Sequence, residues 1–190
     1  MGRPTKEEAE QAVKLLLQYI GEDTSREGLR DTPKRVVKSY DELFEGYSHD
    51  IAKVLNKRFH DISEYNDVVL LKSVNFTSLC EHHMLPFSGT VDIAYVPDRV
   101  VVGVSKLARL VDIFSKRLQI QERMTANIAC ALQKYLQPKG VAVRVSATHS
   151  CMTTRGTLKE GSILESSHFT GVYLDNYEKR QEFWSMIRKG

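Results

Sequence analysis

The strongest constraint on the fold is the strict alternation of side chains between residues 141 and 151. Apolar or titratable side chains occupy every second position there, and small or polar residues fill most of the others. The members of the first set are Val141, Val143, Val145, Ala147, His149 and Cys151. Because successive residues of a strand point to opposite faces, this segment is predicted to be a strand with one buried face. His149 and Cys151 are expected on the same side of its end.

Further strands and helices are predicted around this segment. Alternation predicts strands at 67–76, 89–96 and about 163–174, and helical periodicity predicts helices at 107–114, 124–135 and 177–188. The order is strand, strand, helix, helix, strand, strand and a closing helix. It predicts an α+β domain with a four-stranded antiparallel sheet and two helices on one face.

The sheet of this domain leaves surfaces that one subunit cannot cover. The strand at 67–76 is apolar on both faces if it alternates throughout, with Val68, Leu70, Val74 and Phe76 opposite Val69 and Leu71. Two helices cover one face only, and the open edges of a four-stranded sheet invite pairing with another chain. The sequence therefore predicts a homo-oligomer joined through its sheets.

A helical region precedes the sheet domain. One helix is predicted over residues 7–20. A second begins with Thr32 as its N-cap and a proline in its first turn, and it is expected to end at Gly46. We therefore expect an N-terminal helical region at 1–66 and a sheet domain at 67–190.

Composition and charge limit the classes of function. Hydrophobic residues make up 42% of the 190 residues and charged residues 27%, which is typical of globular proteins. No apolar run approaches the ~18 residues of a membrane span, and no secretory signal precedes the first predicted helix. The net charge of +3 is far from the clustered positive charge of a nucleic-acid-binding face. We expect a cytoplasmic protein that binds neither membranes nor nucleic acids.

Two pairs of metal-binding residue types lie far apart in the sequence. Cys80 and His83 form one pair after the first strand, and His149 and Cys151 form the other. Thiolate and imidazole are ligands that Zn²⁺ favours, so the pairs together predict one zinc site. Three ligands, Cys80, His83 and Cys151, would leave a fourth position for water, as in catalytic sites. His82 and His149 would then lie beside the metal, whereas four protein ligands would make a closed structural site.

Basic residues near the helix at 107–114 predict an anion site. Ser105 is a suitable N-cap for that helix, and Lys106 and Arg109 follow in its first turn. Cations at this end oppose the helix dipole unless an anion binds there, although two solvated surface charges would give the same pattern. Further basic residues that could join such a site are Arg155, Arg35 and Lys38.

The next helix begins with Gln121 and Glu122, which suit recognition of a base edge. A carboxylate accepts two parallel N–H donors, such as those of guanine N1 and N2, and an amide beside it adds a donor and an acceptor. Glu122 is equally explained as an acid that the helix dipole favours. The residues alone leave both explanations open.

Six ordered blocks of the sequence resemble GTP cyclohydrolase I. They lie at 26–29, 32–36, 80–83, 105–109, 119–123 and 149–156. The resemblance implies the α+β tunnelling fold (T-fold), with sheets joined into a barrel in a decamer of two pentamers and active sites between subunits. It also implies conversion of GTP and water to formate and 7,8-dihydroneopterin triphosphate, the first step of pterin and tetrahydrofolate biosynthesis.

The resemblance further implies a role for each candidate residue. The implied zinc ligands are Cys80, His83 and Cys151. The implied acid–base residues are His82 and His149, and the implied guanine-binding residues are Gln121 and Glu122. The residues implied around the triphosphate are Ser105, Lys106, Arg109, Arg155, Arg35 and Lys38.

The chain departs from the usual family pattern at two places. Family members usually carry an acidic residue at the position of Ser146 and a Ser/Thr-rich run at 162–168. Ser146 is expected on the strand face opposite His149, where its change would affect a supporting hydrogen bond. The change at 162–168 could alter subunit packing or the wall of the site. These departures leave a non-catalytic or altered-product nucleotide-binding relative of the same fold as the alternative.

Overall fold

The structure is a computed structural model that describes residues 2–62 and 65–188. Contacts divide the chain into two compact units, residues 1–45 and 46–190. The second unit begins earlier than the sheet domain expected from the sequence, because Leu55 is fully buried in its core.

The described part of the first unit is helical, as predicted. Its helices are α1 (Lys6–Tyr19), α2 (Glu27–Arg30) and α3 (Thr32–Leu43). α1 begins with a capping box, in which Thr5 and Glu8 each accept a hydrogen bond from the other's backbone N–H. The N-cap of α3 is Asp31 rather than Thr32, so the predicted start is one residue late.

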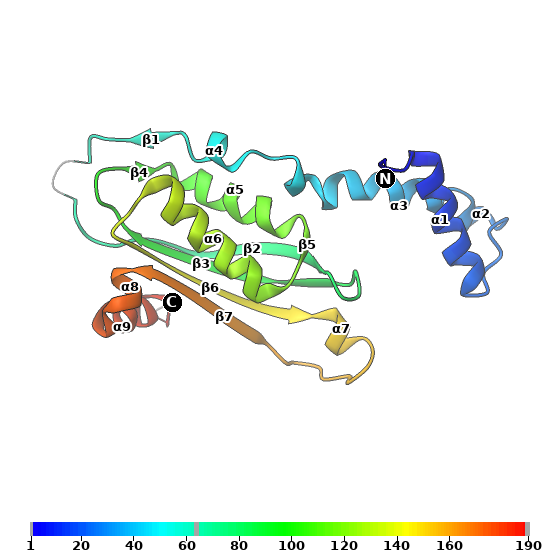
Figure 1. Ribbon diagram of the computed structural model, residues 1–190. Helices are drawn as coiled ribbons and strands as arrows, with labels where there is room; N and C mark the ends of the chain where they lie inside the picture. Colours follow the sequence, from blue (N-terminus) through cyan, green and yellow to red (C-terminus); the bar gives the residue numbers. More distant parts are fainter. Residues whose placement is uncertain (1, 63–64, 189–190) are drawn as a thin grey trace. The chain divides into compact units, whose positions relative to one another are not determined.

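A five-stranded sheet in the order β5-β2-β3-β6-β7 forms the centre of the described second unit (Figure 1). The strands are β2 (Val69–Cys80), β3 (Pro86–Val96), β5 (Leu118–Gln119), β6 (Gly140–His149) and β7 (Leu164–Gly171). The four long strands pair antiparallel, as predicted, and β5 adds a short parallel strand beside β2. The helices that cover one face are α5 (Val104–Ser115) and α6 (Gln121–Leu136).

Apolar side chains are buried on both faces of the sheet. The remaining elements of this unit are η1 (Glu45–Tyr47), α4 (Ile51–Val54), β1 (Arg58–Phe59), β4 (Val101–Val102), α7 (Ser150–Thr153), α8 (Val172–Asp175) and α9 (Tyr177–Arg188). The larger core joins Ile93 and Val143 of the sheet to Ile128 of α6. On the other face, Tyr173 of α8 and Phe183 of α9 belong to a second cluster. Each large side chain buried in this way contributes about 1.5–3 kcal/mol.

Gly46 does not end α3, contrary to the prediction from the sequence. It lies in η1, where a Cβ would come within 2.2 Å of the carbonyl oxygen of Ile113. Its N–H donates to the carbonyl of Lys116, and its own carbonyl accepts from the guanidinium of Arg117. Glycine is needed here for close backbone packing against the end of α5, and not as a helix terminator.

β2 does not alternate throughout its length. Its register with β3 shifts between Leu71 and Val74, and Ser73 has a φ of 57°, which marks a β-bulge. The N–H of Ser73 donates to the carboxylate of Asp92 on β3 at 2.9 Å. Leu71 and Val74 consequently pack against the same core, although strict alternation predicts opposite faces.

β6 ends at His149, before the end of the strand predicted from the sequence. The next four residues form the helical turn α7, so Cys151 lies on a helix. An alternating pattern cannot distinguish the last residues of a strand from a single helical turn that follows it. The prediction that His149 and Cys151 share a strand face is therefore wrong, although both side chains reach the same pocket.

Gly89 allows β3 and β6 to approach closely, and alanine there should destabilise the protein. A Cβ at Gly89 would lie 1.9 Å from the carbonyl oxygen of Ser146, a backbone atom of the β6 strand. Overpacking costs about 1–3 kcal/mol, and we expect Gly89→Ala to reach at least the upper value because backbone must move. Denaturant unfolding measures the loss, with Gly28→Ala as the control, since no atom lies within 4 Å of a Cβ there. Equal stability of the two variants would contradict this expectation.

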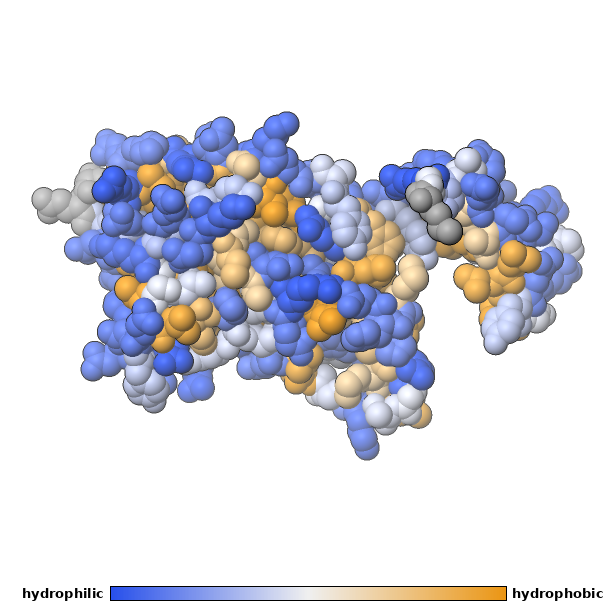
Figure 2. Space-filling model, viewed as in Figure 1, coloured by the Kyte–Doolittle hydropathy of each residue, from blue (hydrophilic) through white to orange (hydrophobic). Residues whose placement is uncertain are grey.

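The surface carries apolar patches among hydrophilic residues. Figure 2 shows a face that is mostly hydrophilic, with apolar residues gathered in separate areas. On α1, Leu16 and Tyr19 are 64% and 86% exposed, a pattern typical of contact surfaces.

Among the described residues, no helix combines the length and apolar character needed to cross a bilayer.

Candidate active site

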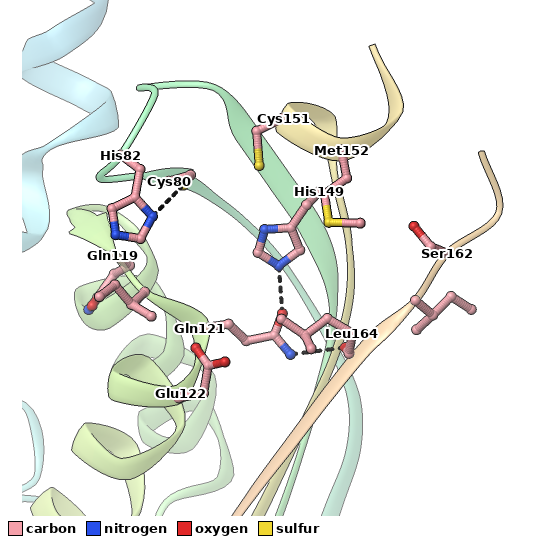
Figure 3. Close-up of a pocket in the computed structure, with 12 residues that line it drawn as sticks. Cys80, His82, Gln119, Gln121, Glu122, His149, Cys151, Met152, Ser162 and Leu164 are labelled. Atoms are coloured by element: carbon pink, nitrogen blue, oxygen red, sulfur yellow. Dashed lines mark hydrogen bonds between the residues drawn. The ribbon is translucent and has the colours of Figure 1, made fainter. Parts of the chain in front are cut away.

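The ends of β2 and β6 and the start of α6 border a pocket of about 330 Å³ (Figure 3). This volume is within the range of small-molecule sites. The remaining wall comes from β5, from α7 and from the segment that leads into β7. The predicted site residues in its lining are Cys80, His82, Gln121, Glu122, His149 and Cys151.

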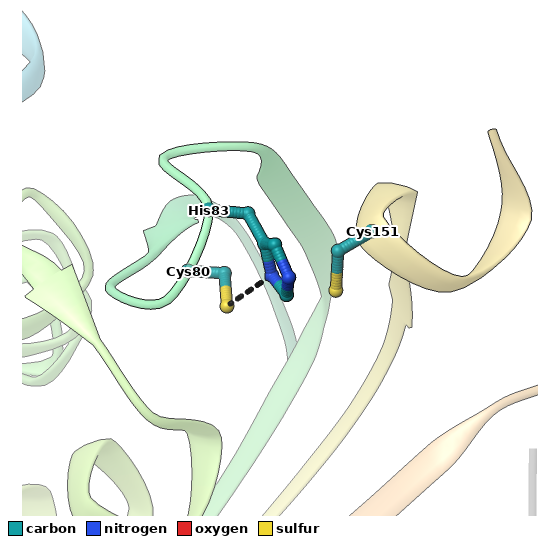
Figure 4. Close-up of side chains that lie close together, drawn as sticks. All are labelled: Cys80, His83 and Cys151. Carbon is teal, nitrogen blue, oxygen red and sulfur yellow. Dashed lines mark hydrogen bonds between the residues drawn. The ribbon is translucent and has the colours of Figure 1, made fainter. Parts of the chain in front are cut away.

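Cys80, His83 and Cys151 converge beside this pocket (Figure 4). Their ligand atoms all lie within 4.8 Å of one another. A tight turn after β2 positions the first two residues. The N–H of Cys80 donates to the carbonyl of Leu85, and Met84, with a φ of 54°, donates its N–H to the carbonyl of Cys80. The turn presents Cys80 and His83 together, and α7 brings Cys151 to them.

These donors fit a soft divalent cation. Burial raises the pKa of the Cys151 thiol, and the neighbouring Cys80 raises it further. A cation between the two sulfurs would stabilise both as thiolates, and two sulfurs with one imidazole nitrogen are ligands that Zn²⁺ favours. Among the described residues, neither His82 nor His149 belongs to the group that could hold the ion. The geometry therefore favours three protein ligands over four.

His149, at the end of β6, is held in place by two contacts. Its ring stacks on that of Phe87 at a centroid distance of 4.5 Å. Its Nε2 lies 2.8 Å from Oε1 of Gln121, within hydrogen-bond distance (Figure 3). Burial lowers the pKa of His149, and Glu122 partly opposes this shift. The lowered pKa favours the neutral form of the imidazole, which can accept a proton.

Gln121 and Glu122 begin α6 but differ in their surroundings. The side chain of Gln121 is buried, and the two N–H groups of its amide are shared among two backbone carbonyls and the hydroxyl of Ser166. The carboxylate of Glu122 borders the pocket (Figure 3). No side chain caps the start of α6, so the first N–H groups of the helix have no side-chain acceptor. Glu122 and this helix start are thus more available to a ligand than the amide of Gln121.

Glu81, between Cys80 and His82, has a partner that the sequence did not indicate. The guanidinium of Arg123 pairs with the carboxylate of Glu81, 42 residues away, and also donates to Oε1 of Gln119. This pair ties the turn after β2 to the first turn of α6.

Three basic or polar residues predicted for the triphosphate lie on α5. The N-cap of α5 is Gly103, so Ser105 is not the cap but lies in the first turn with Lys106, which corrects the prediction. Neither of these residues lines the pocket of its own chain, and Arg109 does not line it either.

The other basic residues predicted for the triphosphate lie in two places. Arg155 is beside the metal-binding group, where its guanidinium donates to Nε2 of His83 at 3.3 Å. Arg35 and Lys38 lie on α3, in the first unit. The guanidinium of Arg35 donates there to the carbonyl of Gly28.

The chain is similar to known proteins over almost its whole length. The family model for GTP cyclohydrolase I matches residues 9–188. GTP cyclohydrolase 1 of Rickettsia felis is 54% identical over 189 residues, and that of Rickettsia massiliae is 53% identical over 189 residues, each covering 100% of both chains. A crystal structure of the archaeosine synthase QueF-Like in the apo form covers 55% of this chain and 93% of its own, with 20% identity and a TM-score of 0.44.

Proposed function

The chain belongs to the GTP cyclohydrolase I family, and from this premise we propose that a zinc ion held by Cys80, His83 and Cys151 is its catalytic centre. The observation that carries the proposal is the convergence of these donors within 4.8 Å beside the pocket of His149 and Glu122. The enzyme would convert GTP and water to formate and 7,8-dihydroneopterin triphosphate.

The donor set suits zinc on chemical grounds. Two thiolates and one imidazole occupy three positions of a tetrahedral ion, as in catalytic sites, whereas structural sites use four protein ligands. Bound here, zinc would supply a Lewis acid that lowers the pKa of water towards neutrality. Opening of the purine ring by water needs no electron transfer, which agrees with a redox-inert ion.

Two histidines of the chain would move protons during this reaction. His149 lines the pocket, its lowered pKa favours the neutral imidazole, and it would accept a proton as the ring opens. His82 also lines the pocket, with Nδ1 3.8 Å from the sulfur of Cys80, and would donate one. Two such transfers are needed, because loss of C8 as formate leaves nitrogens that must be protonated before the pterin ring closes. Positioned imidazoles typically contribute about 10²–10⁴-fold to such steps.

Glu122 would bind the guanine base. Its carboxylate can accept both N1–H and N2–H, which lie parallel on one edge of guanine. The uncapped N–H groups at the start of α6 would donate to the neighbouring O6. A carboxylate beside free helix N–H groups therefore matches the donor and acceptor pattern of this base edge.

Replacing Glu122 with glutamine should weaken binding of GTP. The amide offers a donor where the carboxylate offers an acceptor, so one guanine N–H loses its partner. Hydrogen bonds to charged groups contribute about 1.5–3 kcal/mol, so we expect KM for GTP to rise about 10- to 100-fold. The control substrate is inosine triphosphate, which lacks the N2 amino group. The KM values for GTP and inosine triphosphate should differ less in Glu122→Gln than in the wild type. An unchanged KM for GTP would exclude Glu122 from base binding.

A second copy of the chain would complete the site. Ser105, Lys106 and Arg109 do not line the pocket of their own chain, although they would suit a triphosphate. Within the described residues, β7 and most of β2 are open on their outer edges, and such edges pair with other chains. We infer that edge pairing forms a decamer of two pentamers, with basic residues supplied between subunits. Light scattering of the purified protein measures its mass, and a monomer would exclude this arrangement.

The reaction itself is tested by product analysis. Metal-loaded protein should release one formate for each GTP consumed, and its product should fluoresce as a pterin after oxidation. Removal of the metal by a chelator should stop the reaction, and added zinc should restore it. GTP binding without formate would instead support the non-catalytic or altered-product relative. Ser162 and Leu164, in the atypical segment 162–168, line the pocket and would be the structural cause.

A further inference from the structure

A chain of hydrogen bonds leads from His149 away from the pocket. Oε1 of Gln121 lies 2.8 Å from Nε2 of His149. The amide nitrogen of Gln121 lies 3.2 Å from the carbonyl oxygen of Val145 and 3.0 Å from that of Leu164. It also lies 3.2 Å from the hydroxyl of Ser166. Two strands and a helix therefore meet at one side chain, which is only 1% exposed.

The two backbone carbonyls determine where the protons of this chain lie. A carbonyl accepts a hydrogen bond but cannot donate one, so the atom of Gln121 that faces both carbonyls is the amide nitrogen. The amide oxygen then faces His149, and because it cannot donate either, Nε2 of His149 must carry the proton. Nδ1 then lies on the edge of the ring away from Gln121 (Figure 3).

Two hydroxyl groups hold the amide in this orientation. The hydroxyl of Thr125 donates to the backbone carbonyl of Gln121 at 2.8 Å. The two hydroxyls of Thr125 and Ser166 lie 2.7 Å apart, so Ser166 must be the donor in that contact. The oxygen of Ser166 is then available to accept from the amide of Gln121. The two N–H groups of the Gln121 amide are thus shared among three acceptors, which are the two backbone carbonyls and the hydroxyl of Ser166.

We propose that Gln121 is a positioning residue that fixes His149 in its Nε2-protonated tautomer, and that the hydroxyl of Ser166 supports it. The proposal rests on the acid–base role proposed for His149. Fixing the tautomer also fixes which edge of the imidazole ring carries the N–H. Turning the amide of Gln121 towards a guanine base would break its hydrogen bonds to His149 and to Ser166. Gln121 thus serves His149, and Glu122 is left to recognise the base.

Two variants of Ser166 isolate the hydroxyl group. Threonine and valine have nearly the same shape, but only threonine keeps a hydroxyl. We expect Ser166→Thr to retain most of kcat. Ser166→Val should lower kcat about 10-fold with KM for GTP unchanged, because loss of a residue that orients a catalytic side chain typically costs about 10- to 100-fold. Gln121→Ala should lower kcat about 10- to 100-fold, again with little change in KM. A Gln121→Ala variant with a raised KM and an unchanged kcat would overturn the positioning role of Gln121. Equal kcat values in the two Ser166 variants would overturn the supporting role of Ser166.

The tautomer itself can be observed without turnover. In solid-state NMR of metal-loaded protein labelled with [¹⁵N]histidine, the signals lost in His149→Asn identify His149. They should show a protonated Nε2 and an unprotonated Nδ1 in the wild type, and a mixture of tautomers in Gln121→Ala. A protonated Nδ1 in the neutral wild-type ring would overturn the proposal. If the wild type gives the expected spectrum but releases no formate, the positioning of His149 by Gln121 stands and only the proposed catalytic function is rejected. The failure of the positioning proposal and the failure of the proposed function can therefore be distinguished.

Discussion

Cys151→Ala should leave the enzyme without its metal and lower formate release from GTP by at least about a thousandfold. Cys151 supplies one of the three donor atoms that converge within 4.8 Å, and its loss leaves two protein ligands for the ion. A catalytic metal contributes several kcal/mol to stabilisation of the transition state, and each 1.36 kcal/mol corresponds to about tenfold in rate. Elemental analysis and formate release, measured on the same sample, report both effects.

Cys130→Ala is the matched control for this experiment. Cys130 lies on α6, is exposed, and has its sulfur 3.8 Å from Nε2 of His168, away from the pocket lining. We expect its metal content and formate release to equal those of the wild type. One metal ion per chain in Cys151→Ala would remove Cys151 from the ligand set, and the proposed catalytic centre would be wrong.

Hydrophobic periodicity predicts most of the sheet and its helices, because each element must bury one face against another. It fails where the backbone departs from regular geometry. Leu71 and Val74 are apolar and suit either face of β2, so their pattern contains no sign of the bulge at Ser73. The bulge depends on Asp92, which is distant in sequence and accepts the N–H of Ser73.

The metal-binding residues could be predicted because their residue types alone restrict what they can bind. Thiols and an imidazole can bind a metal whether they lie on a strand or on a helix. The prediction that Cys151 joins Cys80 and His83 therefore did not depend on its predicted secondary structure, which was wrong. The surroundings of Gln121 could not be predicted in the same way. Its partners come from β6 and β7, and its contacts depend on how α6 packs against both strands. Ser166 has no distinctive sequence signal, because a serine on a strand is common and usually structural.

His149→Ala should show the opposite pattern to Cys151→Ala, with the metal retained and turnover lowered about 10²- to 10⁴-fold. His149 lies at the pocket but outside the group of described residues that could hold the ion. Its removal should therefore abolish proton transfer without disturbing the three donors. His149→Asn should also retain the metal, since it keeps a donor towards Gln121 while removing the imidazole.

His168→Ala is the control for these two variants, because His168 contacts Cys130 and does not line the pocket. It should keep both metal and turnover. Loss of metal in His149→Ala and in His149→Asn, with metal retained in His168→Ala, would make His149 a fourth ligand. A site closed by four protein side chains has no position for water on the ion. Metal content in the His149 variants therefore decides between a catalytic and a structural zinc centre, independently of any rate.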